Sequence, residues 1–219
     1  TLVSADAGTV ITCTVTATNA VTSVTSTSTG TSAILQIPVV SSAPTISGTT
    51  TVGNALSSTT GTWTGYPASF SYAYQWNRAG SAISGATSSS YTLVSADASN
   101  TITCTVTATN STGSASSTSS ATAAIAQSPV NTSAPSISGA TAQGSTLSST
   151  TGSWTGYPAS FSYAYSWYRN GGPISGATSS TYSTVSADIG ANVQCVVTAT
   201  NATGSTTAAS NTIVPTVAP

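Results

Sequence analysis

A strictly alternating run of apolar and polar residues occurs three times along the chain. Residues 11–19 read ITCTVTATN, residues 102–110 repeat the same nine letters, and residues 193–201 read VQCVVTATN. Successive side chains of a β-strand point to opposite faces, so alternation with a period of two predicts a strand that buries one face. Each run is therefore predicted to be a strand with its cysteine on the buried face.

A second alternating run precedes each of the last two. Residues 71–78, SYAYQWNR, place Tyr72, Tyr74, Trp76 and Arg78 on one face of a strand. Further short strand-like runs follow, with turn residues between them. Six or seven short strands in roughly 90 residues are typical of a β-sandwich.

The pattern repeats with a period of 91 residues. Cys13, Cys104 and Cys195 are each 91 positions apart, and Trp76 and Trp167 keep the same step. Proline-containing segments, VVSSAPTISG and VNTSAPSISG, separate the copies. The predicted division is an incomplete domain at residues 1–41, followed by complete domains at residues 42–132 and 133–219.

Residues 1–41 match only the last part of the repeat, because Thr1 corresponds to Thr92 and Ser183. Such a C-terminal part of a domain has an exposed apolar face and an unpaired strand edge. We expect it to be completed either by a further segment of a longer repeat protein or by strands of another chain.

The composition favours an all-β protein and excludes several partners. Only 2% of the residues are charged, against about a quarter in an ordinary soluble domain. Threonine, valine and tyrosine favour strands, whereas good helix formers are scarce. Nucleic acid binding requires clustered Lys and Arg, and a membrane span requires a long apolar run. The sequence has neither feature, so we expect no nucleic acid partner and no membrane insertion.

Residues 74–113 resemble the bacterial immunoglobulin-like (Ig-like) repeats of surface and secreted proteins and of phage tail and virion proteins. They read YQWNRAGSAISGATSSSYTLVSADASNTITCTVTATNSTG. The shared pattern is a strand tryptophan, then I-x-GAT-x-S-x-Y, then AD, then VTATN-x-x-G. The matching residues are Trp76, Ile83, Gly85, Ala86, Thr87, Tyr91, Asp97 and Asn110, and in the next repeat Trp167, Ile174, Gly176, Ala177, Thr178, Tyr182, Asp188 and Asn201.

The resemblance implies tandem Ig-like Greek-key β-sandwiches, a fold used in spacers, adhesive heads and filament subunits alike. Antibody-type domains bridge a cysteine on strand B to one on strand F, but the corresponding residues 54–61, NALSSTTG, have no cysteine. We therefore expect Trp76, Trp167, Cys13, Cys104 and Cys195 to be structural core residues. The alternative is an intermolecular disulfide or a reactive thiol.

Each complete repeat carries one arginine and one aspartate. Arg78 recurs as Arg169 and Asp97 as Asp188, which predicts an ion pair or a turn-capping aspartate. Catalysis would need a second acid, a histidine or a metal, and the chain has no histidine and no lysine. One carboxylate per repeat cannot build a calcium site, and no His or clustered Cys offers a zinc site. We therefore predict no catalytic residue, no metal site, no cofactor and no enzyme.

Four aromatic residues outside the tryptophan strand are candidates for ligand binding or inter-domain packing. They are Tyr66, Phe70, Tyr157 and Phe161. Exposed aromatic rings can stack on sugars, so a glycan platform is one hypothesis. Tyr72 and Tyr74 are instead expected to point inward with Trp76, because they share its face.

Three sequons offer candidate N-glycosylation sites. They begin at Asn110, Asn131 and Asn201. Asn110 and Asn201 are equivalent and follow the cysteine strand. In a chain so rich in serine and threonine, sequons also arise by chance.

The scarcity of charge bears on assembly. Natural monomers place lysine on exposed sheet edges, which prevents pairing between molecules. A chain without that protection and with tandem units is predicted to self-associate as an extracellular filament or stalk. The alternative is an adhesin or glycan-binding module of a bacterial surface, phage tail or virion protein, with a glycan or cell-surface receptor as partner. Both hypotheses place the protein outside the cell, at a cell surface or on a virion.

Overall fold

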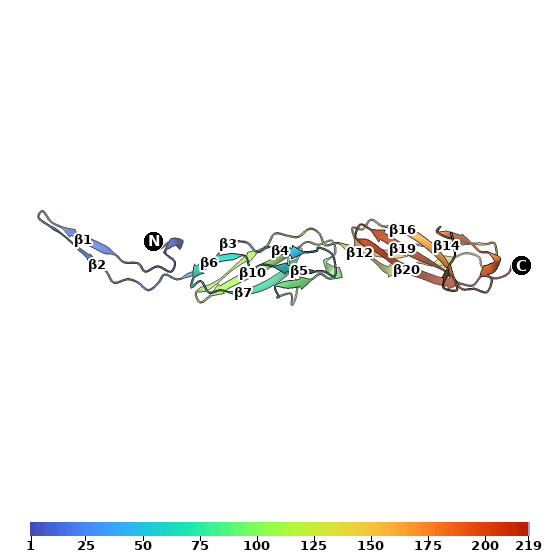
Figure 1. The fold of residues 1–219 in the computed structure, drawn as a ribbon, viewed down its shortest axis with the longest axis horizontal. Coiled ribbons are helices and arrows are strands. Elements are labelled where there is room, and N and C mark those ends of the chain that lie inside the picture. Colours follow the sequence, from blue (N-terminus) through green and yellow to red (C-terminus); the bar gives the residue numbers. More distant parts are fainter. Residues whose placement is uncertain (219) are drawn as a thin grey trace. The chain divides into compact units, whose positions relative to one another are not determined.

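The protein is built from β-strands and short 3-10 turns (Figure 1). The computed structural model describes residues 1–218, and within them no helix is long and apolar enough to cross a membrane. Two compact units are present. The first comprises Thr1–Thr49, Asn54–Leu93 and Asn100–Ala123, and the second comprises Thr50–Gly53, Val94–Ser99 and Ala124–Pro219.

The first unit contains a hairpin and a two-sheet sandwich. Its strands are β1 (Thr14–Thr18), β2 (Ser23–Thr27), β3 (Gln36–Ser42), β4 (Ile46–Gly48), β5 (Ala55–Ser58), β6 (Thr62–Tyr66), β7 (Ser71–Arg78), β8 (Ser81–Ala82), β9 (Ser90–Thr92), β10 (Ile102–Asn110) and β11 (Gly113–Thr118). Between residues 1 and 218 the chain forms three 3-10 turns, η1 (Ser4–Asp6), η2 (Ser95–Asp97) and η3 (Ser186–Asp188).

The sandwich of the first unit has the strand arrangement of an Ig-like domain. One sheet has the order β11-β10-β7-β8 and the other β4-β5-β9, while β3 pairs with β6. The chain leaves the second sheet after β5, returns to it at β9 and leaves again for β10, as in a Greek key. The ring centroids of Trp76 on β7 and Tyr91 on β9 lie 5.9 Å apart, so the two sheets meet across the core. The predicted fold class is confirmed.

The second unit repeats this arrangement. Its strands are β12 (Gln127–Ser133), β13 (Ile137–Ser138), β14 (Thr146–Ser149), β15 (Ser153–Tyr157), β16 (Ser162–Arg169), β17 (Gly172–Pro173), β18 (Thr181–Ser183), β19 (Val193–Asn201) and β20 (Gly204–Ile213). The sheets have the orders β17-β16-β19-β20 and β13-β14-β18, and β12 pairs with β15. The core gathers Ile137 and Leu147 from one sheet with Trp167, Val193, Cys195 and Val197 from the other.

A glycine lets one extended stretch change partners. β5 pairs with β4 and β9. β6 begins shortly after the end of β5, but it pairs with β3. Gly61 lies between them with φ +73°, and a Cβ there would be 2.5 Å from the carbonyl oxygen of Ser42. Only glycine combines this left-handed backbone with so close an approach.

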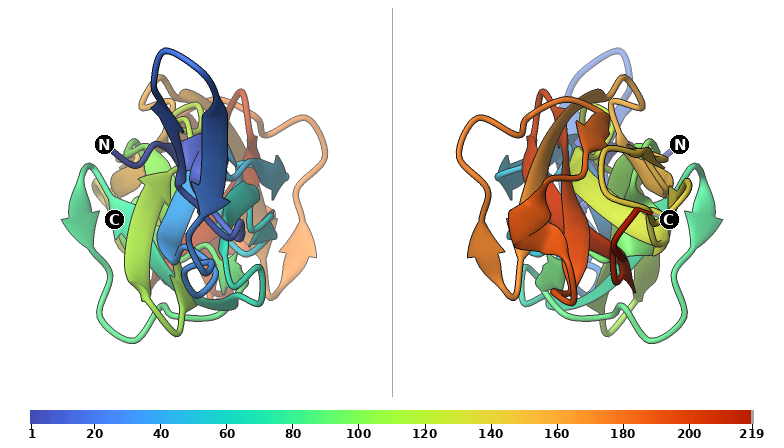
Figure 2. Two further views of the ribbon diagram at one scale, coloured as in Figure 1. Left: turned by 90° about the vertical axis from the view of Figure 1, so that its left-hand side faces the viewer. Right: turned by 90° about the vertical axis from the view of Figure 1, so that its right-hand side faces the viewer.

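The hairpin of the first unit consists of β1 and β2. The two strands are antiparallel, and the left view of Figure 2 shows them in dark blue as two adjacent ribbons joined by a turn. Every residue of both strands is exposed. β3 follows the hairpin and pairs with β6, although the boundary predicted at residue 42 assigns it to the preceding part-domain. The division into three domains stays a prediction.

Candidate functional site

Two of the three cysteines lie in the sandwich cores. Cys104 on β10 and Cys195 on β19 are 0% exposed, and each lies opposite a fully buried tryptophan of the neighbouring strand, Trp76 or Trp167. Burial raises the pKa of both thiols. Since the thiolate is the reactive form, these cysteines are packed side chains and poor nucleophiles.

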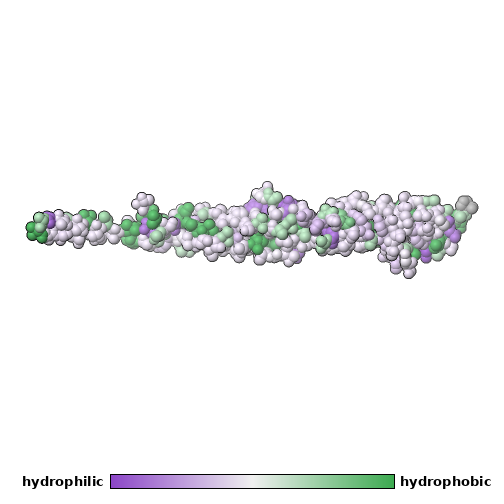
Figure 3. Space-filling model, turned by 90° about the horizontal axis from the view of Figure 1, so that it is seen from above, coloured by the Kyte–Doolittle hydropathy of each residue, from purple (hydrophilic) through white to green (hydrophobic). Residues whose placement is uncertain are grey.

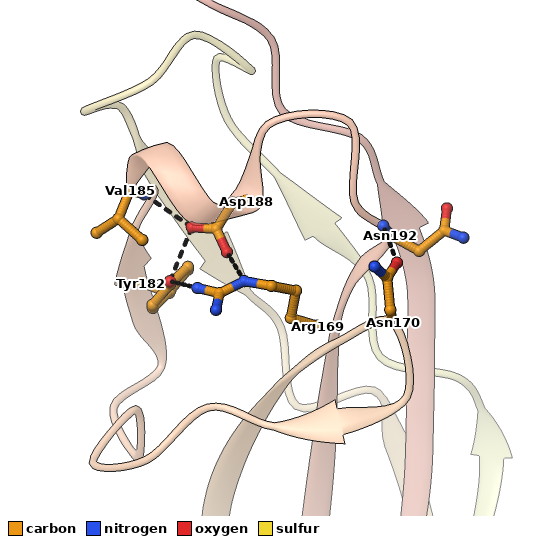
Figure 4. A network of polar contacts seen from close by, with 6 residues as sticks. All are labelled: Arg169, Asn170, Tyr182, Val185, Asp188 and Asn192. Atoms are coloured by element: carbon orange, nitrogen blue, oxygen red, sulfur yellow. Dashed lines mark hydrogen bonds and ion pairs between the residues drawn. The ribbon is translucent and has the colours of Figure 1, made fainter.

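The charged residues of the last repeat form a network around a buried aspartate, in which the Arg169 side chain is 29% exposed (Figure 4). The Nε of Arg169 lies 2.6 Å from Oδ1 of Asp188, and the Tyr182 hydroxyl donates to Oδ2 of Asp188 at 2.8 Å. The Nη2 of Arg169 lies 3.3 Å from the Tyr182 hydroxyl, and the Val185 N–H donates to Oδ2 of Asp188 at 2.7 Å. Asp188 is 0% exposed, so these donors replace its water.

The pKa values in this network describe a fixed ion pair. Burial alone raises the pKa of Asp188, but the hydrogen bonds from Val185, Arg169 and Tyr182 outweigh it, and the pKa lies below its ordinary value. The hydrogen bond with Asp188 raises the pKa of Arg169, while burial and then Asp188 raise the pKa of Tyr182. None of the three groups exchanges a proton near neutral pH, which general acid–base catalysis would require.

The preceding repeat has corresponding contacts. The Nη2 of Arg78 lies 3.4 Å from the Tyr91 hydroxyl, and the Val94 N–H donates to Oδ2 of Asp97 at 2.7 Å. Asp97 is 0% exposed. The predicted pairing of Arg78 with Asp97 stays a prediction.

Asn110, the asparagine of the first sequon, connects three segments of the chain through hydrogen bonds of its side chain. The Nδ2 of Asn110 donates to the carbonyl oxygens of Gln36, at 2.8 Å, and Pro67, at 3.1 Å. Its Oδ1 accepts the N–H groups of Thr112, at 3.0 Å, and Gly113, at 3.1 Å. One side chain therefore joins β3, the loop after β6 and the turn between β10 and β11.

The second sequon asparagine of this kind makes the same four contacts. The partners of Asn201 are Gln127 and Pro158 through Nδ2, and Thr203 and Gly204 through Oδ1. Asn110 is 8% exposed and Asn201 is 9% exposed. A glycan attached to this Nδ2 would replace one of its two N–H donors, and the predicted glycosylation of Asn110 and Asn201 stays a prediction. Asn131 is half-buried, and its glycosylation stays a prediction.

The candidate aromatic residues differ in exposure. Tyr66 is 37% exposed, and its ring lies against Gly8, where an added Cβ would be 2.8 Å from Cδ2 of Tyr66. Tyr72 is 38% exposed, which corrects the expectation that alternation sends it inward. It lies near the start of β7, where the Phe70 ring is its aromatic neighbour at a centroid distance of 6.5 Å. The remaining candidates, Phe70, Tyr157 and Phe161, are half-buried.

The first cysteine differs from its two copies because it lies in the open hairpin. Cys13 is exposed, and Val15 on β1 is 62% exposed. The apolar residues of the identical sequence in β10 are all 0% exposed; they are Ile102, Cys104, Val106 and Ala108. The expectation that Cys13 is a core residue is therefore wrong. The reason is that β10 pairs with both β7 and β11, whereas β1 pairs with β2 alone among residues 1–218.

The base of the hairpin keeps the local contacts of a complete domain. Ala7 bridges to Ile34, and the Gly8 N–H donates to the Ile34 carbonyl at 2.8 Å. Ala98 and Ser99 make the same contacts with Ile125. An open hollow of ≈ 480 Å³ lies beside Ile34. It is lined by Leu2, Val3, Ser4, Ala7, Ile34, Leu35 and Gln36.

Exposed apolar residues gather on and near this hairpin. Figure 3 shows a largely pale surface, neither strongly hydrophilic nor strongly hydrophobic, with green atoms on the hairpin. The exposed fractions are 57% for Leu2, 62% for Val15, 91% for Val21, 65% for Val24 and 61% for Leu35. No group of three His, Cys, Asp or Glu side chains that could hold a metal ion is found between residues 1 and 218. The apolar side chains of the hairpin are therefore exposed in this structure.

Comparison with known proteins gives structural likenesses only. No protein-family model and no curated protein matches the chain. An I-band fragment of titin is 19% identical with a TM-score of 0.42, and the match covers 97% of this chain and 76% of the fragment. Immunoglobulin domains 1–5 of Sidekick-1 are 17% identical with a TM-score of 0.32, and the match covers 99% of this chain and 46% of the Sidekick-1 chain. Three N-terminal domains of the highly immunogenic outer capsid protein of bacteriophage RB49 are 14% identical with a TM-score of 0.33. This match covers 80% of this chain and 59% of the capsid protein chain.

Proposed function

We propose that the chain is a structural segment of an extracellular filament or stalk built from tandem Ig-like domains, in which another segment or another chain completes the hairpin. The observation that carries this proposal is the contrast between residues 11–19 and residues 102–110, which have the same sequence, although Val15 is 62% exposed and its counterpart Val106 is 0% exposed. Burying a side chain such as valine stabilises a protein by about 1.5–3 kcal/mol. Completion of the hairpin therefore has a substantial driving force.

The surface supports an assembling protein outside the cell. The chain has two basic and three acidic residues, and the face drawn in Figure 3 is largely pale, which corresponds to residues of intermediate hydropathy. Lysines that would oppose edge-to-edge pairing are absent from the sequence. Such a surface tolerates contact between molecules.

Catalysis is not part of the proposal. The acid of the last repeat is held by Arg169 and Tyr182 with its pKa lowered, and the thiols of Cys104 and Cys195 have raised pKa values. Neither arrangement supplies a nucleophile with an adjacent base. We therefore propose a non-enzymatic role without a cofactor.

Sedimentation velocity and negative-stain microscopy of the purified chain test this function. We expect assembly that increases with protein concentration, because the open hairpin faces associate. Val15→Asp is expected to suppress it, since this charge would lie on the associating face. Val21→Asp, in the turn of the hairpin, is the matched control and is expected to assemble normally. A chain that stays monomeric at high concentration contradicts the proposal.

A second candidate function is adhesion or glycan binding. It is favoured by the Phe70–Tyr72 ring pair and by the exposure of Tyr66 and Tyr72, 37% and 38%. A glycan array is the test, with Tyr72→Ala as the variant that should lose any signal. An array without hits removes this candidate and leaves the structural function untouched.

A further inference from the structure

In the last repeat, a side chain binds the backbone at the free edge of the short strand β13. The N–H of Ile137 donates to Oδ1 of Asn211 at 2.7 Å, and the Ile137 carbonyl oxygen accepts a hydrogen bond from Nδ2 of Asn211 at 3.4 Å. Ile137 is 5% exposed. One carboxamide group therefore satisfies both the donor and the acceptor of this buried residue.

The preceding repeat lacks this carboxamide. Its residues 91 positions earlier are Ile46 on β4, in place of Ile137, and Ser120, in place of Asn211. A serine side chain carries one hydroxyl and does not present the paired donor and acceptor of a carboxamide. Among residues 1–218, no hydrogen bond joins Ser120 to Ile46, and Ile46 is half-buried.

The register of β4 turns the polar groups of Ile46 outward. The Thr59 N–H donates to the Thr45 carbonyl oxygen at 3.0 Å, so Thr45 faces the strand β5. Ile46 is the next residue and lies opposite Ser58. Since hydrogen-bonded and non-hydrogen-bonded pairs alternate in an antiparallel ladder, the N–H and C=O of Ile46 point away from β5. In the part of the chain that the structure describes, β5 is the one strand that pairs with β4.

A hollow of ≈ 250 Å³ lies beside this edge. A second sequence difference widens it, because Thr122 stands where the last repeat has Ile213, which packs against the core. Oγ1 of Thr122 instead accepts the Ile102 N–H at 3.0 Å. The residues that line the hollow carry no charge; they are Pro44, Thr45, Ile46, Ser120, Ala121 and Thr122.

We infer that this hollow is a docking site for an extended, uncharged segment of a partner polypeptide, which pairs with Ile46 as an antiparallel strand. One residue of the partner supplies the carbonyl oxygen and the N–H that Asn211 supplies in the last repeat. A strand fits this edge better than a side-chain carboxamide, whose second bond to Ile137 is 3.4 Å long. Strand addition at a free sheet edge is an established mode of peptide recognition. Pro44 has no N–H, so the pairing centres on Ile46 and is short.

A short blocked peptide of alternating threonine and valine is the probe, and nuclear magnetic resonance of the full nitrogen-15-labelled chain is the measurement. We expect the peptide to move the amide proton resonance of Ile46 downfield, because this N–H gains an acceptor. Methylation of the peptide nitrogens should weaken the affinity about tenfold, since it removes the donors to the Ile46 carbonyl. Propionamide presents a carboxamide without a strand. If it binds at Ile46 as tightly as the peptide, the occupant is a side chain and the inference is overturned.

Variants of the chain exchange the edges of the two repeats. Ser120→Asn supplies the missing carboxamide, so it should move the Ile46 amide resonance without any peptide and weaken peptide binding about tenfold. Ser114→Asn, at an exposed position of β11, is the matched control and should bind the peptide normally. The double variant Asn211→Ser, Ile213→Thr should create a second site, which the Ile137 amide resonance reports.

Two results would overturn the inference. One is a peptide that changes other resonances of the chain and leaves that of Ile46 in place, and the other is unchanged peptide affinity in Ser120→Asn. The site does not depend on the proposed function. Peptide binding at Ile46 in a chain that never assembles supports the docking site and contradicts the filament, whereas assembly without peptide binding supports the filament and removes the docking site.

Discussion

Asn201 ties together three segments that are far apart in the sequence. Its side chain bonds to Gln127 on β12, to Pro158 after β15 and to the turn between β19 and β20. Asn19 has the same local sequence, TATN, but its Oδ1 accepts only the N–H groups of Val21 and Thr22 within its own turn. The number of hydrogen bonds that this asparagine makes therefore depends on which segments of the chain lie beside it.

Asn201→Ala should lower the free energy of unfolding by roughly 2–4 kcal/mol, because four hydrogen bonds are lost and the carbonyl oxygen of the buried Gln127 loses this donor. Chemical denaturation followed by tryptophan fluorescence measures this. The matched control is Asn19→Ala, whose exposed turn should cost less than about 0.5 kcal/mol. Equal losses in the two variants would show that Asn201 acts within its turn alone.

Stability should depend on pH only at the extremes. The folded pKa of Asp188 lies below the ordinary value of 3.8, so its contribution is complete above that value and is lost as the pH falls. The pKa of Tyr182 lies above the ordinary value of 10.0, so its contribution is complete below that value and is lost as the pH rises. The pKa values of the Cys104 and Cys195 thiols lie above the ordinary value of 9.0, so their contributions are also lost as the pH rises. The thermal midpoint is therefore expected to be flat from about pH 5 to pH 8. Asp188→Asn should lower the midpoint at neutral pH and flatten its fall in acid; an unchanged acid limb would contradict the assignment.

At the scale of the element, β1 and β10 show that a sequence pattern predicts a strand but not its burial. Residues 11–19 and 102–110 have the same nine letters; the predicted strand forms over all nine residues in β10 and over Thr14–Thr18 alone in β1. Whether the apolar face is buried depends on β7 and on the opposite sheet, which cover β10 alone. An alternating pattern predicts that a strand has one apolar face, but it does not predict whether other strands cover that face.

The thiols report this difference directly. One thiol per native chain, Cys13, should react with Ellman's reagent, and all three should react in denaturant, because Cys104 and Cys195 are buried. Peptide mapping after brief labelling identifies the residue. Cys13→Ser is the control and should leave no reactive thiol in the native protein. Labelling of all three cysteines in the native state would contradict the buried positions of the other two.

Other elements show where sequence reasoning ends. The run ALSSTTGTW contains two strands, β5 and β6, because Gly61 turns the backbone between them and each strand pairs with different neighbours. The sequence pattern identified Asn110 only as the start of a sequon and did not predict its hydrogen bonds, because their partners lie 74 and 43 positions away in the sequence. The spacing of the tryptophans and cysteines was enough to predict the repeat and its core. Hydrogen bonds between distant segments produce no comparable periodic pattern in the sequence, so they could not be predicted in this way.

At the scale of the whole molecule, the chain relies on apolar cores and hydroxyl-rich surfaces with few charges. The buried residues are mainly aliphatic side chains with one tryptophan and one cysteine in each complete domain. Surface hydroxyls pair along the strands, as between Thr107 and Ser116 at 2.7 Å. Only five formal charges occur in the side chains, and Asp188 is buried. Salt can therefore screen very little.

This predicts a stability that sodium chloride barely changes. Between 0.05 and 1 M, as a rough experimental range, the Debye length falls from about 14 to about 3 Å, yet the thermal midpoint should move by less than about 2 °C. Calorimetry in sodium chloride measures this, since sulfate would add its own stabilisation through exclusion from the surface. The same titration on Arg169→Gln is the control, because it removes the pair with the buried aspartate and should lower the midpoint equally at every salt concentration. A steep salt dependence of the native chain would show that its few charges stabilise it through long-range interactions, which their number and burial do not favour.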